Sequence, residues 1–252
     1  MGLPVRRILV LVFSASLLAL PALPWAPETR VGMADEAVRL MPASLRIALE
    51  RHRADLLRGL LTPLTADGPD RRAPWAGGTL DQALDEESQA LVALLDQPTE
   101  FAVLAEEFGA LAHFVFEAGF PPGVSREDGA TRYTHFAQFC ESRRPRFPLV
   151  FYGHDNDALS RSDYRGFALE ILRRAAEDDH QLARAYAAAG DPPDPAAFDD
   201  RSVPFAVGSL AYSRSVGDLV SLWLALWDGA GGDTYRTPYR NPTDSGSNQR
   251  RP

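Results

Sequence analysis

The arrangement of apolar and polar residues predicts a protein built almost entirely of helices. Apolar side chains recur every three to four residues through most of the chain, and this spacing places them on one face of a helix. Turns rich in proline and glycine separate these segments. The expected helices span residues 33–41, 44–61, 79–95, 98–118, 125–144, 160–189 and 205–228.

The segment 205–228 is strongly apolar and is predicted to be a central core helix. The one candidate strand is residues 147–152, and it contains a proline, which disfavours a strand. The chain is therefore expected to be all-α, with a single-domain helical bundle over residues 23–228. Residues 229–252 are rich in Gly, Thr, Pro, Asn, Ser and Arg and are predicted to be a disordered polar tail.

The first 22 residues have the pattern of a targeting segment. Arg6 and Arg7 precede a mostly apolar stretch over residues 8–20. This stretch is too short for a comfortable membrane span, which needs about 20 residues, and it fits a secretory signal peptide cleaved after Ala22. The protein is therefore predicted to be exported, either periplasmic or extracellular. The alternative is an uncleaved segment, which would anchor the protein to a membrane.

The amino-acid composition excludes several kinds of functional site. The 252 residues include 26 Lys and Arg against 34 Asp and Glu, a formal net charge of −8. An acidic protein does not attract nucleic acid through its overall field, so no nucleic-acid partner is expected. Every basic residue is an arginine, which excludes a lysine Schiff base and a Gly-Lys-Ser/Thr phosphate loop. The one cysteine, Cys140, excludes an intrachain disulfide and a cysteine-rich zinc site.

His113 and Glu117 are the first candidates for a functional site. They lie four residues apart on the helix expected over residues 98–118, so both project from the same face. An imidazole and a carboxylate at this spacing can share a metal ion or pair with each other. Because the surrounding sequence is unusually apolar, a buried pair of this kind needs further partners.

Other polar groups are weaker candidates. His135 lies on the next expected helix, and residues 154–157 form either a cation-binding loop or a solvated turn. Residues 178–180 fit the polar face of a long helix, and His52 fits an exposed stripe. Asp70 follows a proline and is either a loop ligand or part of an Asx-type turn.

Several of these features share an order with one known family. They are a tryptophan near the mature N-terminus, a Thr-x pair before a helix ending in proline, a Pro-Asp loop, a Gly-x-x-x-His helix and an apolar closing helix. In this chain they are Trp25, Thr29-Arg30, Leu40-Met41-Pro42, Pro69-Asp70, Gly109–Gly123 and Leu222–Trp227. This layout, over residues 25–232, resembles the secreted zinc-dependent phospholipase C family and the related single-strand-specific nucleases.

The resemblance implies an all-α fold and a cluster of three zinc ions that activates water against a phosphodiester. His113 matches a histidine ligand of that family, and Asp70 matches the loop aspartate. Arg30 stands where the family has a histidine, Glu117 where it has an aspartate, and Gly123 where it has the final histidine of the motif.

A later ligand of the family corresponds to His135 or Glu141. A zinc site normally takes three or four well-placed ligands. The remaining set is therefore too small for three metal ions.

Three functions remain open at this point. The first is an exported, non-catalytic protein without the trinuclear zinc site or any cofactor, in which Arg30 replaces the charge of a metal and pairs with Glu117 or Asp70. The second is a metal-dependent phosphoester hydrolase, phospholipase C-like or nuclease-like, with one zinc ion held by a reduced set of ligands. That set comprises His113, Glu117, Asp70 and His135. The third is an unrelated envelope protein with a binding or structural role.

Overall fold

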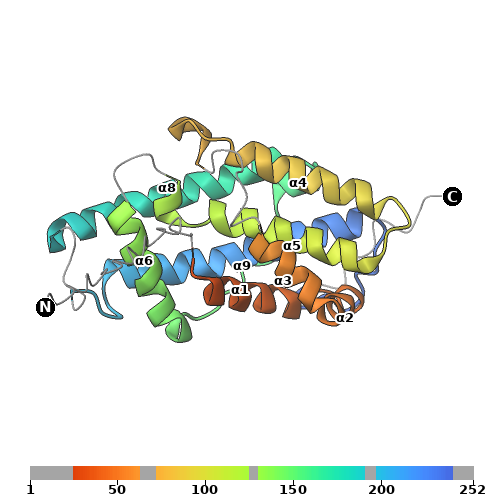
Figure 1. Cartoon of the computed structure of the whole chain (residues 1–252), viewed down its shortest axis with the longest axis horizontal. Coiled ribbons are helices and arrows are strands. Elements are labelled where there is room, and N and C mark those ends of the chain that lie inside the picture. The colour runs from red at the N-terminus through yellow and green to blue at the C-terminus, as the bar shows by residue number, and fades with distance from the viewer. Residues whose placement is uncertain (1–24, 63–71, 125–129, 191–196, 241–252) are drawn as a thin grey trace, which may run out of the picture.

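The computed structural model describes residues 25–62, 72–124, 130–190 and 197–240 (Figure 1). The predicted signal peptide and Asp70 lie outside these residues. All regular elements within the described ranges are helices, so the prediction of an all-α protein is confirmed. The α-helices are α1 (Pro27–Arg39), α2 (Ala43–Arg51), α3 (Arg53–Leu61), α4 (Leu80–Leu95), α5 (Phe101–Ala118), α6 (Ala130–Arg143), α7 (Asp157–Ser160), α8 (Tyr164–Ala189) and α9 (Val203–Gly229).

The helix boundaries differ from the sequence prediction at identifiable residues. Helix α1 begins at Pro27 rather than at residue 33, because proline is favourable in the first turn, where its missing N–H has no helical partner. The helix expected over 44–61 is broken at His52, whose backbone leaves the helical region between α2 and α3. Residues 147–152 form no strand.

Helix α9 lies at the centre of the bundle, as its apolar sequence predicts. Its buried side chains include Val216, Leu219 and Trp223, and it packs against α1, α5, α6 and α8. Helices α8 and α9 run along the long axis of the molecule (Figure 1). Within the described residues, no helix is both long and apolar enough to cross a membrane.

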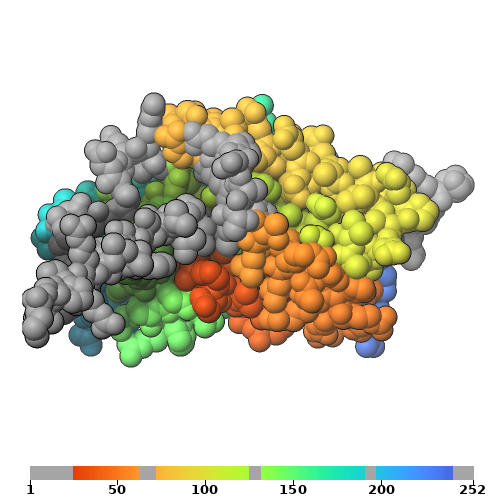
Figure 2. All heavy atoms as spheres, in the orientation of Figure 1, coloured from red at the N-terminus to blue at the C-terminus, as the bar shows by residue number. Residues whose placement is uncertain are grey.

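The backbones of α3 and α5 are in direct contact where two glycines face them. A Cβ atom on Gly59 of α3 would lie 1.8 Å from the carbonyl oxygen of Glu106. A Cβ atom on Gly109 of α5 would lie 2.0 Å from the carbonyl oxygen of Leu56. The segments carrying α3 and α5 adjoin on the face seen in Figure 2. This contact fixes the position of α5, which carries His113 and Glu117.

We expect Gly59→Ala and Gly109→Ala each to lower the free energy of unfolding by about 2 kcal/mol or more, because backbone atoms cannot move aside for a methyl group. Thermal and urea unfolding of the purified variants measure the loss. Gly229→Ala is the control, since a Cβ atom there has no neighbour within 4 Å. If both variants unfold like the control, the two backbones do not touch.

Glu87 of α4 and Glu107 of α5 form a carboxyl pair between the two helices. Burial and a hydrogen bond with Glu107 raise the pKa of Glu87 from its ordinary value of 4.5 to about 8. The folded state therefore holds a proton that the unfolded chain releases at lower pH. The resulting stability is fully present below pH 4.5 and falls as the pH rises toward 8.

We expect Glu87→Gln to remove this pH dependence, because an amide donates to Glu107 as the protonated carboxyl does. Near pH 8 the variant gains about 1–2 kcal/mol over the wild type, after a reduction for solvent screening. Urea unfolding between about pH 5 and 8 measures the slope. Glu86→Gln, an exposed neighbour on α4, keeps the wild-type slope. Equal slopes in the wild type and Glu87→Gln would contradict the shared proton.

The segment after α9 is ordered further than its composition predicted. The indole Nε1 of Trp227 donates to the carbonyl oxygen of Asp233 at 3.1 Å, and the hydroxyl of Ser44 donates to the same oxygen at 2.7 Å. The Nε2 atom of His154 lies 2.8 Å from the carbonyl oxygen of Pro238. The predicted disordered tail therefore does not begin at residue 229, because side chains from three regions bind residues 230–240. Residues 241–252 lie outside the described residues.

Candidate functional site

Arg30, His113 and Glu117 form a buried polar cluster between α1 and α5. Arg30 and His113 are 0% exposed, and Glu117 is 6% exposed. Arg30 lies on the face of α1 that enters the core, and the two α5 residues share a face, as their spacing predicted. The structure thus brings together three of the five residues proposed from the sequence.

The three side chains are connected in series. The guanidinium Nη1 of Arg30 lies 2.7 Å from His113 Nδ1. On the other side of the ring, Nε2 lies 3.0 Å from the Glu117 carboxylate oxygen Oε2. A second Arg30 nitrogen, Nε, donates to the carbonyl oxygen of Trp25 at 3.3 Å. A contact between Arg30 and a carboxylate was expected. The contacts that connect Arg30 to the Glu117 carboxylate run through the His113 ring.

These distances fix the protonation of His113. A guanidinium nitrogen can only donate, so Nδ1 of His113 must accept from Arg30. Nε2 then carries the proton and lies 3.0 Å from the Glu117 carboxylate oxygen Oε2. A longer contact of Nδ1 with the Leu60 carbonyl oxygen, at 3.3 Å, would need a proton on Nδ1, and the 2.7 Å contact excludes that proton. The cluster therefore places a neutral imidazole between a guanidinium and a carboxyl group.

Trp25 closes the cluster on the N-terminal side of α1. Its side chain is 0% exposed, and its indole Nε1 donates to the carbonyl oxygen of Phe116 at 3.1 Å. Its φ of 48° lies in the left-handed region, which costs free energy for a residue with a Cβ atom. The buried indole, its hydrogen bond to α5 and the Arg30 contact hold this conformation.

His135 belongs to a different set of contacts. Its Nδ1 lies 2.7 Å from the hydroxyl of Tyr186 on α8, and its ring packs edge-on against Phe198. Among the residues that the structure describes, no group of three His, Cys, Asp or Glu side chains could hold a metal ion. The predicted zinc site had four ligands. Three of them, His113, Glu117 and His135, form no such group in the structure, and the fourth, Asp70, lies outside the described residues.

The weaker candidates have structural partners or are exposed. His52 pairs with Asp55 at 3.2 Å. Asp178 and Asp179 bind Arg214 and Arg132, respectively, in ion pairs of 3.0 and 3.2 Å. His180 is exposed. The hydroxyl of Thr29 donates to Glu141, the other candidate for a later ligand.

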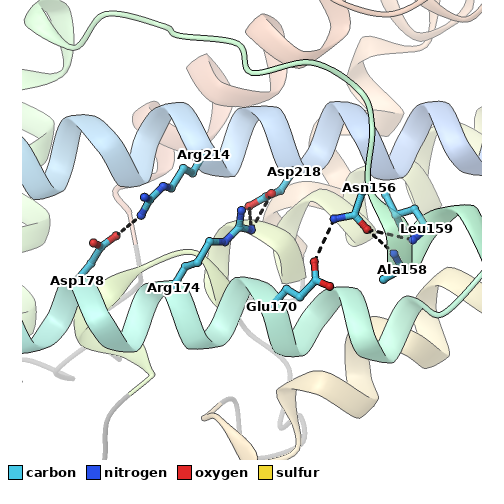
Figure 3. A network of polar contacts seen from close by, with 8 residues as sticks. All are labelled: Asn156, Ala158, Leu159, Glu170, Arg174, Asp178, Arg214 and Asp218. Atoms are coloured by element: carbon cyan, nitrogen blue, oxygen red, sulfur yellow. Dashed lines mark hydrogen bonds and ion pairs between the residues drawn. The ribbon is translucent and has the colours of Figure 1, made fainter.

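Sequence reasoning missed a polar layer between α8 and α9, shown in Figure 3. Nη2 of Arg174 donates to both carboxylate oxygens of Asp218 at 2.8 Å, and Nη1 of Arg214 donates to Asp178 at 3.0 Å. Burial raises the pKa of both aspartates, although the arginines act in the opposite direction. The sequence signal was the spacing of four residues from Arg174 to Asp178 and from Arg214 to Asp218.

Two pockets lie beside this layer. The larger is lined by α9 and residues 153–162 and 239–240, and the smaller by α8, α9 and residues 152–156. Their volumes are about 540 and 350 Å³, within the usual range for small-molecule sites. Asp155, Asn156 and Ser221 line both, so the pockets adjoin. Asn156 is held on one side by Glu170, to which its amide donates at 3.1 Å, and its side-chain oxygen caps α7 (Figure 3). The wall that the pockets share is therefore fixed.

Comparisons with protein-family models, with curated proteins and with solved structures found no match to this chain. The likeness to zinc-dependent phospholipase C therefore remains a prediction that rests on the order and spacing of residues. The helical architecture is established by the structure, and function must be argued from the two polar sites themselves.

We expect Arg30→Met to lower the free energy of unfolding by about 3–5 kcal/mol, because it leaves a buried carboxylate and imidazole without their cation. Adding Glu117→Gln should restore part of the loss, since the two residues act through one imidazole. Urea unfolding of the single and double variants measures this coupling. Arg39→Met is the control, because that α1 side chain is 62% exposed. A loss no larger than in the control would contradict a structural role for Arg30.

Proposed function

We propose that this chain is an exported, non-catalytic helical protein with a phospholipase C-like layout, and that it works by binding. The observation that carries the proposal is the 2.7 Å contact between Arg30 and His113. On the resemblance, Arg30 takes the place of a histidine ligand. A guanidinium is a permanent cation without a free lone pair, so it supplies the positive charge of a metal but cannot bind one.

The protonation of His113 supports the same conclusion. A histidine binds zinc through an unprotonated ring nitrogen. Here Nδ1 accepts from Arg30, and the protonated Nε2 lies against the Glu117 carboxylate at 3.0 Å. Binding zinc at His113 would require one of these contacts to break inside the core, and the broken contact would leave a buried charge without its partner.

Burial also favours a structural role over a catalytic one. A phosphodiester must reach the activated water at a hydrolytic metal site. Arg30 and His113 are 0% exposed, and Glu117 is 6% exposed. The cluster therefore has the environment of a core element that orients α1 on α5.

The competing function is a phosphoester hydrolase with a single zinc ion. Three of its four proposed ligands are described, and only His113 and Glu117 are in contact with each other. His135 contacts Tyr186 instead. This function would need Asp70 or another group to complete the site, and metal analysis distinguishes the two proposals.

Metal content and hydrolysis test the proposal. The full chain is expressed with its own N-terminal segment, equilibrated with zinc sulfate, dialysed and analysed by mass spectrometry of metals. We expect less than about 0.1 zinc per chain and no hydrolysis of p-nitrophenylphosphorylcholine or single-stranded DNA. One zinc per chain, with activity lost on chelation and in His113→Ala but kept in the exposed control His180→Ala, would establish the hydrolase instead.

A further inference from the structure

The adjoining pockets form one elongated cleft along α9. The α9 residues that line it recur at helical spacing and therefore form one stripe: Arg214, Gly217, Asp218, Ser221, Leu224, Ala225, Asp228 and Gly229. From Arg214 to Asp228 the stripe is about 21 Å long at the rise of an α-helix. The cleft is therefore long enough for a ligand of several linked six-membered rings, and it is as wide as one face of the helix.

The charges that line this cleft balance. Three arginines and three aspartates contribute to the two pockets: Arg174, Arg214 and Arg240, and Asp155, Asp218 and Asp228. Arg174 is paired with Asp218, Arg240 with Asp228 and Arg214 with Asp178. A simple anion or cation gains little from such a lining, because each guanidinium already has its counter-ion. The net charge of −8 further disfavours an anion.

Paired charges suit a ligand that both donates and accepts hydrogen bonds. Among the described residues, Arg174 uses only Nη2 for its partner and Arg214 only Nη1, so other N–H groups are available to a ligand in the pocket they line. Carboxylate oxygens beside them accept. A hydroxyl group matches both at once, and hydrogen bonds to charged groups are the stronger ones. Asn156 and Ser221 add further neutral donors and acceptors to the shared wall.

Two exposed tyrosines stand at the rim. Tyr152 is 70% exposed and lines the smaller pocket, whereas Tyr239 is 77% exposed and lines the larger one. Tyr239 has a left-handed φ of 61° and its ring packs on Phe151 at 5.8 Å. An exposed, conformationally costly aromatic residue offers a flat apolar face beside polar groups. The C–H face of a sugar ring fits such a surface.

From these observations we propose that the cleft binds a neutral carbohydrate of several rings. Its hydroxyls contact the arginine–aspartate pairs of α8 and α9, and its ring faces lie on Tyr152 and Tyr239. This extends the binding role proposed above, but it uses a different part of the molecule from the Arg30 cluster. If the protein is found to bind zinc, the non-catalytic proposal fails but the carbohydrate proposal is unaffected. If no carbohydrate binds, the non-catalytic proposal is likewise unaffected.

Glycan-array screening of the full chain, followed by calorimetry, tests the proposal. The calorimetric probes are maltotriose, cellotriose and chitotriose, with inorganic phosphate and glutamate as charged controls. We expect at least one neutral glycan to bind and neither charged probe to bind. Sedimentation with insoluble cellulose, chitin and peptidoglycan distinguishes a polymer from a free oligosaccharide as the source of the sugar.

Two variants locate the binding. Tyr152→Ala is expected to weaken binding about tenfold, whereas Tyr235→Ala, an equally exposed tyrosine that lines neither pocket, leaves it unchanged. Gly217→Leu fills the cleft from its floor and should abolish binding. Its Cβ atom meets only the Phe151 ring, at 3.9 Å, and leucine favours a helix, so this variant stays folded by thermal unfolding.

The outcomes that overturn the proposal are distinct. No bound neutral glycan at millimolar concentration excludes a carbohydrate ligand. Binding of phosphate or glutamate alone makes the cleft an anion site instead. A glycan that binds Gly217→Leu as tightly as the wild type lies outside the cleft, which also contradicts the proposal.

Discussion

The arrangement of the bundle depends on one buried arginine. The guanidinium of Arg30 enters the core from α1 and reaches a carboxylate of α5 through a neutral imidazole. A charge in a protein interior is tolerated only when its partners are close and well oriented. This requirement fixes the rotation of both helices about their axes. It also positions Trp25, whose carbonyl oxygen accepts from the same guanidinium.

The helix contacts around α5 reinforce this constraint. Gly59 and Gly109 let the α3 and α5 backbones touch, so α5 cannot slide along its axis without a clash. The carboxyl pair on its other side, Glu87 with Glu107, adds a contact that depends on a shared proton. Helix α5 therefore contacts three neighbouring helices in three ways. Its backbone touches α3, Glu107 shares a proton with Glu87 of α4, and His113 and Glu117 connect to Arg30 of α1.

Most of the helices could be predicted from the sequence, whereas fewer of the polar contacts between helices could. Apolar spacing predicted the helices because burial of one face is a local property of a sequence. The spacing of His113 and Glu117 predicted their shared face for the same reason. Arg30 is 83 residues from His113, so local spacing could not pair them. The resemblance placed Arg30 in the same site, but it predicted a carboxylate, not the imidazole, as its direct partner. The α8–α9 layer was missed because arginine and aspartate four residues apart also occur on solvated faces.

The order of the helices along the chain has a consequence for how the bundle folds. The centre of the bundle, α9, follows the other helices of the described chain, and residues 230–240 bind side chains from earlier segments. Contacts of α3 with α5 and of α4 with α8 join earlier parts of the chain, so they can form without α9. Helices α1 and α6, in contrast, find their main helical partner in α9, so their packing is completed only when the last of these helices docks.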